Sequence, residues 1–228
     1  MEKKITSTRV FLRFLIAQER CRVDLDLAVP KLAHWRLATL PRSLTPEQVT
    51  QLIGACQGDT PRRVRDRAIV MLLLMLGLRA GDVAALQITD LDWDDAAIRV
   101  SGKGRYQVRL PLVQEVGDSI IEYLSCRPSV KHNTCLFVSN IAPYCAISSH
   151  CVSSVVKRAL SRAGIEAPVK GAHLLRHTAA SQMLRHGVPL EQIGAVLRHR
   201  NVDTTAYYAK VDVSLLSRVT QPWPEVFS

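Results

Sequence analysis

The feature that most constrains the fold is an uninterrupted apolar run from Ala68 to Leu78. These 11 residues fall well short of the ~20 that a helix needs to cross a bilayer. The run therefore predicts a helix buried in a protein core, and no membrane partner is expected. A chain of 228 residues, 47% of them hydrophobic, can supply that core as one large domain or as one domain plus a fragment.

The charge balance favours a polyanionic partner. The chain has 30 Lys and Arg against 20 Asp and Glu, a net charge of +10. An excess of this size is most simply explained by nucleic acid binding, although many basic proteins bind no DNA. Charge alone leaves the question open until the motifs are considered.

The six cysteines are scattered through the sequence and show no C-x-x-C spacing. They suggest neither a zinc site nor a disulfide framework. Reduced thiols in a cytoplasm are the plain interpretation. The first residues are charged and do not resemble a signal peptide, so a cytoplasmic protein is expected.

Residues 1–43 are expected to be the C-terminal remnant of a helical domain plus a linker. Residues 7–20 predict an amphipathic helix, with Phe11 and Phe14 on one side. The stretch is too short to bury that aromatic side by itself. Residues 44–228 then form the second predicted domain.

Local signals place the elements of this second domain. Thr45, Pro46 and Gln48 suit the N-cap, N1 and N3 positions of a helix, and form a capping box. Strands are predicted at 98–100 and 108–110, with Lys103 at or beside the tip of the hairpin between them. Further elements are predicted as a helix over 112–126, a short strand over 136–138, and helices over 148–163 and 189–198.

One helix brings an imidazole and a guanidinium together. His173 and Arg176 are three residues apart and so share a helix face. Gly187 is placed as a C′ glycine that ends this helix. Downstream, His199 and Tyr208 lie nine residues apart. His, Arg, His and Tyr are the side chains that phosphoryl transfer to a protein hydroxyl would require.

Each of these residues, taken singly, also has an ordinary structural explanation. Arg79 could cap a helix or pair with Asp82. Lys103 could be a solvated turn residue, and His173 a satisfied structural histidine. Arg176 alone could be a surface residue. Joint occurrence in one order is what favours a functional explanation.

Arg79, Lys103, His173-x-x-Arg176, His199 and Tyr208 occur in that order. Over about residues 44–210 the chain resembles the tyrosine recombinase, or phage-integrase-type, family. The resemblance implies an α+β, mostly α-helical catalytic domain with a small antiparallel β-sheet. It implies a preceding helical core-binding domain, and residues 1–43 resemble the last part of it.

The resemblance assigns the cations to the scissile phosphate. Arg79 and Arg176 would each present a fork of donors to the non-bridging oxygens. His199 would donate one further hydrogen bond. Preorganised donors of this kind act where charge develops in the transition state.

The remaining roles concern the nucleophile and the protons. Tyr208 would attack and form a 3′-phosphotyrosyl linkage; Tyr207 stands beside it, and the family spacing from His199 selects Tyr208. His173 would help to remove the phenolic proton. Lys103 would protonate the leaving 5′ oxygen. The ester conserves the bond energy, so no cofactor and no metal are expected.

A further set of basic residues is expected to contact the DNA backbone or to form a solvated face. They are Arg62, Arg63, Arg65, Lys157 and Arg158. Two positions depart from the family pattern: Arg198 stands where the family usually has Gly, and Asp82 where it more often has Glu. A non-glycine at position 198 costs free energy if the backbone there is left-handed.

The sequence therefore predicts a site-specific DNA recombinase or integrase. Double-stranded DNA is the expected partner, with a homotetramer on paired DNA sites and accessory recombinase or DNA-bending proteins as further partners. The resemblance also implies that the apolar tail, which contains Leu215, Leu216, Trp223 and Phe227, packs onto a neighbouring protomer. The alternatives are a non-catalytic DNA-binding remnant and a type IB topoisomerase.

Overall fold

The computed structural model describes residues 2–29, 43–101, 107–130, 133–167 and 169–198. The chain divides into two compact units, Met1–Thr39 and Leu40–Ser228. Each unit is described by itself below.

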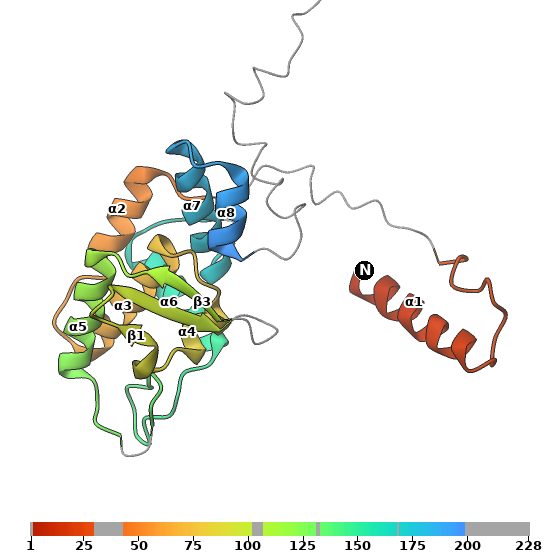
Figure 1. The fold of residues 1–228 in the computed structure, drawn as a ribbon, viewed down its shortest axis with the longest axis horizontal. Helices are drawn as coiled ribbons and strands as arrows, with labels where there is room; N and C mark the ends of the chain where they lie inside the picture. Colours follow the sequence, from red (N-terminus) through yellow and green to blue (C-terminus); the bar gives the residue numbers. More distant parts are fainter. Residues whose placement is uncertain (1, 30–42, 102–106, 131–132, 168, 199–228) are drawn as a thin grey trace, which may run out of the picture. The chain divides into compact units, whose positions relative to one another are not determined.

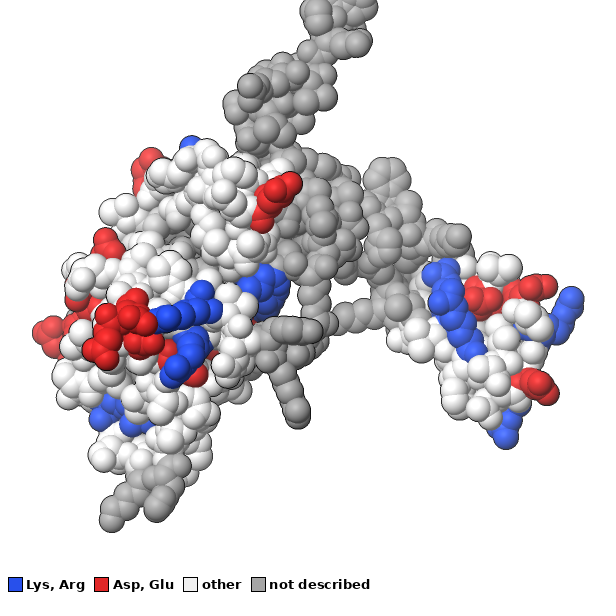
Figure 2. Space-filling model, viewed as in Figure 1, with Lys and Arg blue, Asp and Glu red and all other residues white. Residues whose placement is uncertain are grey.

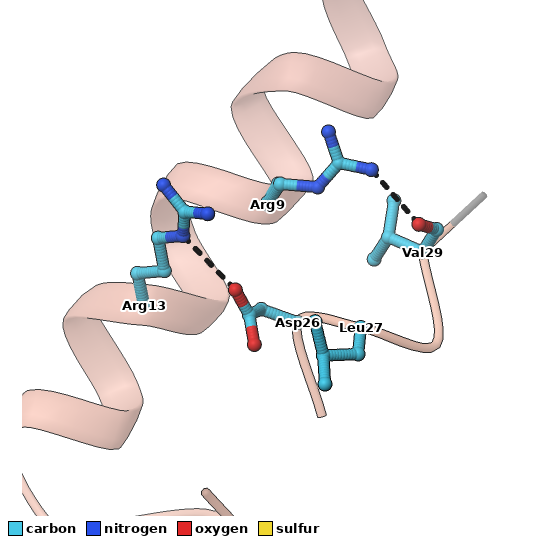
Figure 3. Close-up of a pocket in the computed structure, with 5 residues that line it drawn as sticks. All are labelled: Arg9, Arg13, Asp26, Leu27 and Val29. Atoms are coloured by element: carbon cyan, nitrogen blue, oxygen red, sulfur yellow. Dashed lines mark hydrogen bonds and ion pairs between the residues drawn. The ribbon is translucent and has the colours of Figure 1, made fainter. Parts of the chain in front are cut away.

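The first unit consists of helix α1 (Glu2–Ala17) and a loop that folds back on it. Arg13 Nε lies 2.9 Å from Asp26 Oδ2, and Arg9 Nη2 donates to Val29 O at 2.8 Å (Figure 3). Helix α1 begins and ends several residues earlier than the helix predicted over residues 7–20. Phe11 and Phe14 remain exposed within the described part of this unit.

The second unit is mostly helical with a small sheet, as predicted (Figure 1). Its described α-helices are α2 (Pro46–Gly54), α3 (Pro61–Met75), α4 (Ala80–Ala85), α5 (Gln114–Cys126), α6 (Ser149–Arg162), α7 (Ala172–Arg185) and α8 (Leu190–Leu197). A short 3-10 helix, η2 (Ile88–Asp90), leads into the strands.

Helix α3 is the centre of this unit and packs against α5, α6 and α7. It is longer at its start than the apolar run predicted, because Thr60 caps it and Pro61 occupies its first position. The apolar residues from Ala68 to Leu74 are buried. The helix ends before Gly77, which adopts a left-handed φ of 58°.

The sheet has the order β1-β2-β3 and is antiparallel, with strands β1 (Leu91–Asp92), β2 (Ala97–Ser101) and β3 (Gln107–Pro111). Ile98 faces Leu110 and Val100 faces Val108 across β2 and β3, which confirms the predicted hairpin strands. The strand predicted over 136–138 is wrong. Within it only Val138 forms a bridge, an isolated pair with Ala146.

Two helix boundaries were predictable from local chemistry. At the start of α2 the Thr45 side chain accepts from the Gln48 amide, and the Gln48 side chain accepts from the Thr45 amide. This reciprocal arrangement confirms the capping box. At the end of α7 Gly187 has a φ of 76°, which confirms its role as a C′ glycine.

The entry of the chain into this unit is tied to α7. Leu44 is buried, and its amide donates to Thr178 Oγ1 at 3.0 Å. The Thr178 hydroxyl in turn donates to Leu174 O at 2.9 Å. The helix that carries His173 and Arg176 is therefore also the attachment point of the segment before α2.

Candidate functional site

A pocket of about 320 Å³ lies between the start of α4 and the start of α7. Among the residues that line it are Arg79, His173 and Arg176, three of the six predicted catalytic residues. Arg79 precedes α4 directly, whereas His173 and Arg176 lie on the first turns of α7. The structure thus brings side chains from two distant stretches of sequence to one cavity.

Arg176 is held rigidly, with only 4% of its surface exposed. Its Nη1 donates to Gly77 O at 2.6 Å, and its Nη2 donates to Leu197 O. Gly77 lies just after the end of α3, and Leu197 is the last residue of α8. At the C-terminal end of a helix the last carbonyls have no intrahelical partner. The guanidinium therefore satisfies buried acceptors and is fixed in orientation at the pocket wall.

Arg79 is held at both its backbone and its side chain. Its amide donates to Asp82 Oδ2 at 2.9 Å, and its Nη2 donates to Arg198 O at 2.7 Å. The ordinary explanation of Arg79 was an ion pair between its guanidinium and Asp82, and the structure does not show this pair. The salt bridge of Asp82 is formed with Arg198 instead.

His173 is partly exposed and stands edge-on to His177, with 4.4 Å between ring centroids and 74° between ring planes. Its pKa is lowered, first by partial burial of the ring and then by the charges of Arg176 and Arg79. All three effects disfavour the imidazolium. A neutral imidazole is the form that can accept a proton.

Three predicted catalytic residues lie outside the residues that the structure describes. They are Lys103, His199 and Tyr208. The described ends nearest to them are Ser101 and Gln107 for the hairpin and Arg198 for the C-terminal stretch. Their assignment stays a prediction.

The residues predicted to contact DNA differ sharply in exposure. Arg62 and Lys157 are exposed, while Arg63 is half-buried and donates to Gln57 O at 2.8 Å. Arg158 is half-buried, and its Nη2 lies 3.6 Å from Asp66 Oδ2.

Arg65 is buried, which argues against the phosphate contact expected for it. Its Nη2 pairs with the fully buried Asp66 at 2.8 Å, and its Nη1 donates to Val138 O at 2.9 Å. Unlike Arg176, Arg65 does not line the pocket between α4 and α7, so its guanidinium would have to leave these partners in order to reach DNA. The physical reason is the adjacent Asp66, which provides the charge that a buried arginine requires.

Acidic and basic side chains lie side by side over the sheet (Figure 2). Arg109 on β3 donates to Asp92 Oδ2 at 3.0 Å and also pairs with Asp95. Exposed pairs of this kind contribute little stability, but they cancel charge locally. This face of the sheet therefore does not present a purely basic surface.

Sequence reasoning missed two features of the site. Ser153 of α6 lines the pocket, but no local signal distinguishes it from other serines in that helix. The salt bridge between Asp82 and Arg198 joins residues that are 116 positions apart. Both positions depart from the family pattern, and this departure was the only sequence signal of the salt bridge. It did not show that the two residues meet.

Within the described residues, no group of three His, Cys, Asp or Glu side chains could hold a metal ion. None of the described helices is long and apolar enough to span a membrane.

A mostly helical unit with a small antiparallel sheet is the architecture of the solved recombinase structures that match this chain. The chain belongs to the phage integrase family, whose family model matches residues 42–214.

Relatives in Sinorhizobium fredii support this membership. The chain is 40% identical over 221 residues to y4rA, named as an integrase/recombinase, covering 96% of this chain and 54% of y4rA. It is 36% identical over 189 residues to y4gC, another protein so named, covering 81% of this chain and 97% of y4gC. The chain thus spans about half the length of y4rA.

Solved structures show the same fold. The crystal structure of XerA recombinase matches with a TM-score of 0.67 and 28% identity, over 94% of this chain and 72% of that chain. XerH recombinase, solved as a post-cleavage complex with a palindromic difH substrate, matches with a TM-score of 0.68 and 24% identity. That match covers 79% of this chain and 53% of XerH, and it shows the fold alone.

Proposed function

We propose that this chain is a site-specific DNA recombinase that cleaves and rejoins double-stranded DNA through a 3′-phosphotyrosyl intermediate at Tyr208. The observation that carries the proposal is the convergence of Arg79, Arg176 and His173 on one pocket. Two fixed guanidinium groups and a neutral imidazole suit a phosphodiester on which negative charge builds up. Membership of the phage integrase family, with relatives named as integrase/recombinase, supports DNA as the partner.

In the proposed reaction the Tyr208 oxygen attacks the phosphorus, and the bond from phosphorus to the 5′ oxygen breaks. His173 takes part in removing the phenolic proton, and Lys103 gives a proton to the leaving 5′ oxygen. Arg79, Arg176 and His199 stabilise the non-bridging oxygens. Rejoining is the reverse attack by a 5′ hydroxyl, so the bond energy stays in the ester.

The proposed enzyme works as a homotetramer on paired DNA sites, in the nucleoid, with accessory recombinase or DNA-bending proteins as further partners. Tetramer formation is assigned to the apolar tail after residue 211, which lies outside the described residues. Deleting residues 212–228 should weaken assembly on paired sites more than binding to a single site. Equal loss of both would count against this assignment.

The covalent intermediate can be tested without knowing the target sequence. A pool of nicked duplexes with randomised sequence around the nick would be incubated with the protein. Cleavage near the nick releases a short fragment that carries the 5′ hydroxyl. Without this hydroxyl the strand cannot be rejoined, so the covalent adduct accumulates. Covalent complexes would be isolated in denaturing detergent and sequenced, with Tyr208→Phe as the test variant and Tyr207→Phe as its matched control.

Adducts should form with the wild type and with Tyr207→Phe, and should be absent with Tyr208→Phe. Arg176→Lys should slow adduct formation by about 10²–10³-fold, because one preorganised donor fork is lost at the phosphate. Equal adduct with Tyr208→Phe would refute the nucleophile. Salt-sensitive DNA binding with no adduct on any nicked duplex would refute the enzyme and favour the non-catalytic alternative.

A further inference from the structure

The last described residue of the C-terminal region adopts an unusual backbone conformation. Arg198 follows α8 with φ 54° and ψ 50°, in the left-handed region that favours glycine. An arginine there costs backbone free energy that a glycine would not. The contacts of the Arg198 side chain indicate why an arginine stands at this position.

The Arg198 guanidinium is buried against a single carboxylate. Its Nη2 pairs with Asp82 Oδ2, and the side chains of both residues are only 9% exposed. Within the described part of the chain, Nε and Nη1 of Arg198 have no hydrogen-bond partner. Buried donors without partners are costly, so this ion pair is a poor source of net stability.

Both ends of Arg79 are bound to this pair. Asp82 Oδ2 accepts from the Arg79 amide, and the Arg198 carbonyl oxygen accepts from Arg79 Nη2 at 2.7 Å. We propose that Arg198 is a positioning residue: its ion pair with Asp82 fixes the backbone at the end of α8 so that the Arg198 carbonyl holds the Arg79 guanidinium at the pocket. This role rests on the proposed function of the pocket.

The proposal separates positioning from stability. Arg198→Gly removes the guanidinium and the left-handed strain, but it leaves the Asp82 carboxylate buried without its charge partner. Adding Asp82→Asn removes that charge while keeping an oxygen that can accept from the Arg79 amide. The double variant should therefore unfold at the same temperature as the wild type or higher, because glycine relieves the left-handed strain and the two buried donors without partners are removed together with the charge pair.

The test compares Arg198→Gly, Asp82→Asn and the double variant in three measurements. These are thermal unfolding, the rate of adduct formation on the nicked duplex selected above, and the NMR signal of the Arg79 Nε–H group, assigned with Arg79→Lys. Ala96→Gly is one control, because Ala96 is also left-handed, with a φ of 44°, but carries no charge. Arg185→Gln is the other, since Arg185 is an exposed arginine.

In the double variant we expect wild-type or higher unfolding temperature, a shifted Arg79 signal, and an adduct rate at least about tenfold below wild type, which corresponds to about 1.4 kcal/mol of transition-state stabilisation. Arg198→Gly alone should lose both stability and rate, and both controls should keep the wild-type rate. A double variant with the wild-type rate and an unshifted Arg79 signal would overturn the proposal.

Failure of the proposed function would be seen separately, as no adduct with the wild-type protein. In that case the Arg79 signal decides the positioning role by itself. The signal is also needed because Arg198 directly precedes His199 in the sequence. A slower rate with an unshifted Arg79 signal would mean that Arg198 does not act through Arg79, and would overturn the proposal as stated.

Discussion

Gly77 allows the packing around Arg176 to be tested by one methyl group. It has a φ of 58°, and its carbonyl oxygen accepts from Arg176 Nη1. A Cβ added at this position would overlap Leu197 Cδ2 and would lie 3.5 Å from Ala179 Cβ. Gly77→Ala therefore introduces both backbone strain and a steric overlap with a fully buried leucine.

The expected loss of stability has three contributions. The left-handed conformation costs an L-residue about 1–2 kcal/mol. Displacing a packed side chain costs about 1–3 kcal/mol, while the stiffer unfolded chain returns about 0.4–1 kcal/mol. The free energy of unfolding should therefore fall by about 3 kcal/mol.

The same substitution should also slow the proposed DNA cleavage. Both carbonyls that hold Arg176 belong to the residues that must move, Gly77 and Leu197. If the Arg176 guanidinium shifts with them, the adduct rate on a nicked duplex should fall together with stability. A mere loss of stability would leave the rate of the folded protein unchanged at low temperature.

The free energy of unfolding would be measured by urea denaturation, with Gly164→Ala as the matched control. Gly164 also has a positive φ, of 63°, but an added Cβ there would meet nothing within 4 Å. Its cost should be the backbone contribution alone, about 1 kcal/mol. If the two variants lost equal stability, the predicted overlap with Leu197 would be refuted.

Three further predictions concern charge and ionisation. Asp66→Ala should lower the free energy of unfolding by about 3–5 kcal/mol, because the buried Arg65 would lose its charge partner; an unchanged melting temperature would contradict this. At about pH 8, His173→Gln and the wild type should have the same free energy of unfolding. Since the pKa of His173 is lowered, protonation below about 6.5 penalises the folded wild type, so the variant should gain relative stability as pH falls through 6.5 towards about pH 5 in urea unfolding. An equal difference at both pH values would refute it. Iodoacetamide should label the exposed Cys151, whose pKa is lowered by its hydrogen bond with the Ser148 hydroxyl, faster than Cys56, whose pKa is raised by burial. Peptide mapping by mass spectrometry measures both rates, and equal labelling would contradict the burial of Cys56.

The parts of the fold that were predictable depend on neighbouring residues. The capping box at Thr45, the two strands of the hairpin and the end of α7 at Gly187 all follow from chemistry within a few positions. The shared face of His173 and Arg176 likewise follows from helical spacing. Both residues line the same pocket.

The parts that failed depend on contacts between distant residues. Arg65 appears in the sequence as one of a run of surface arginines, but its side chain is buried, where it pairs with Asp66 and donates to the carbonyl of the distant Val138. Residues 136–138 have strand composition, yet they find no neighbouring strand to continue the pairing beyond Val138. The pairing of Asp82 with Arg198 could not be inferred from either position alone.

The hydrogen bond from the Leu44 amide to Thr178 has a practical consequence for protein engineering. A shortened version that begins after residue 44 would remove the donor and leave the buried Thr178 hydroxyl with one partner fewer, on the very helix that carries His173 and Arg176. A fusion joined at or before residue 40 keeps this bond intact. The choice of junction should therefore influence the pocket as well as the yield of folded protein.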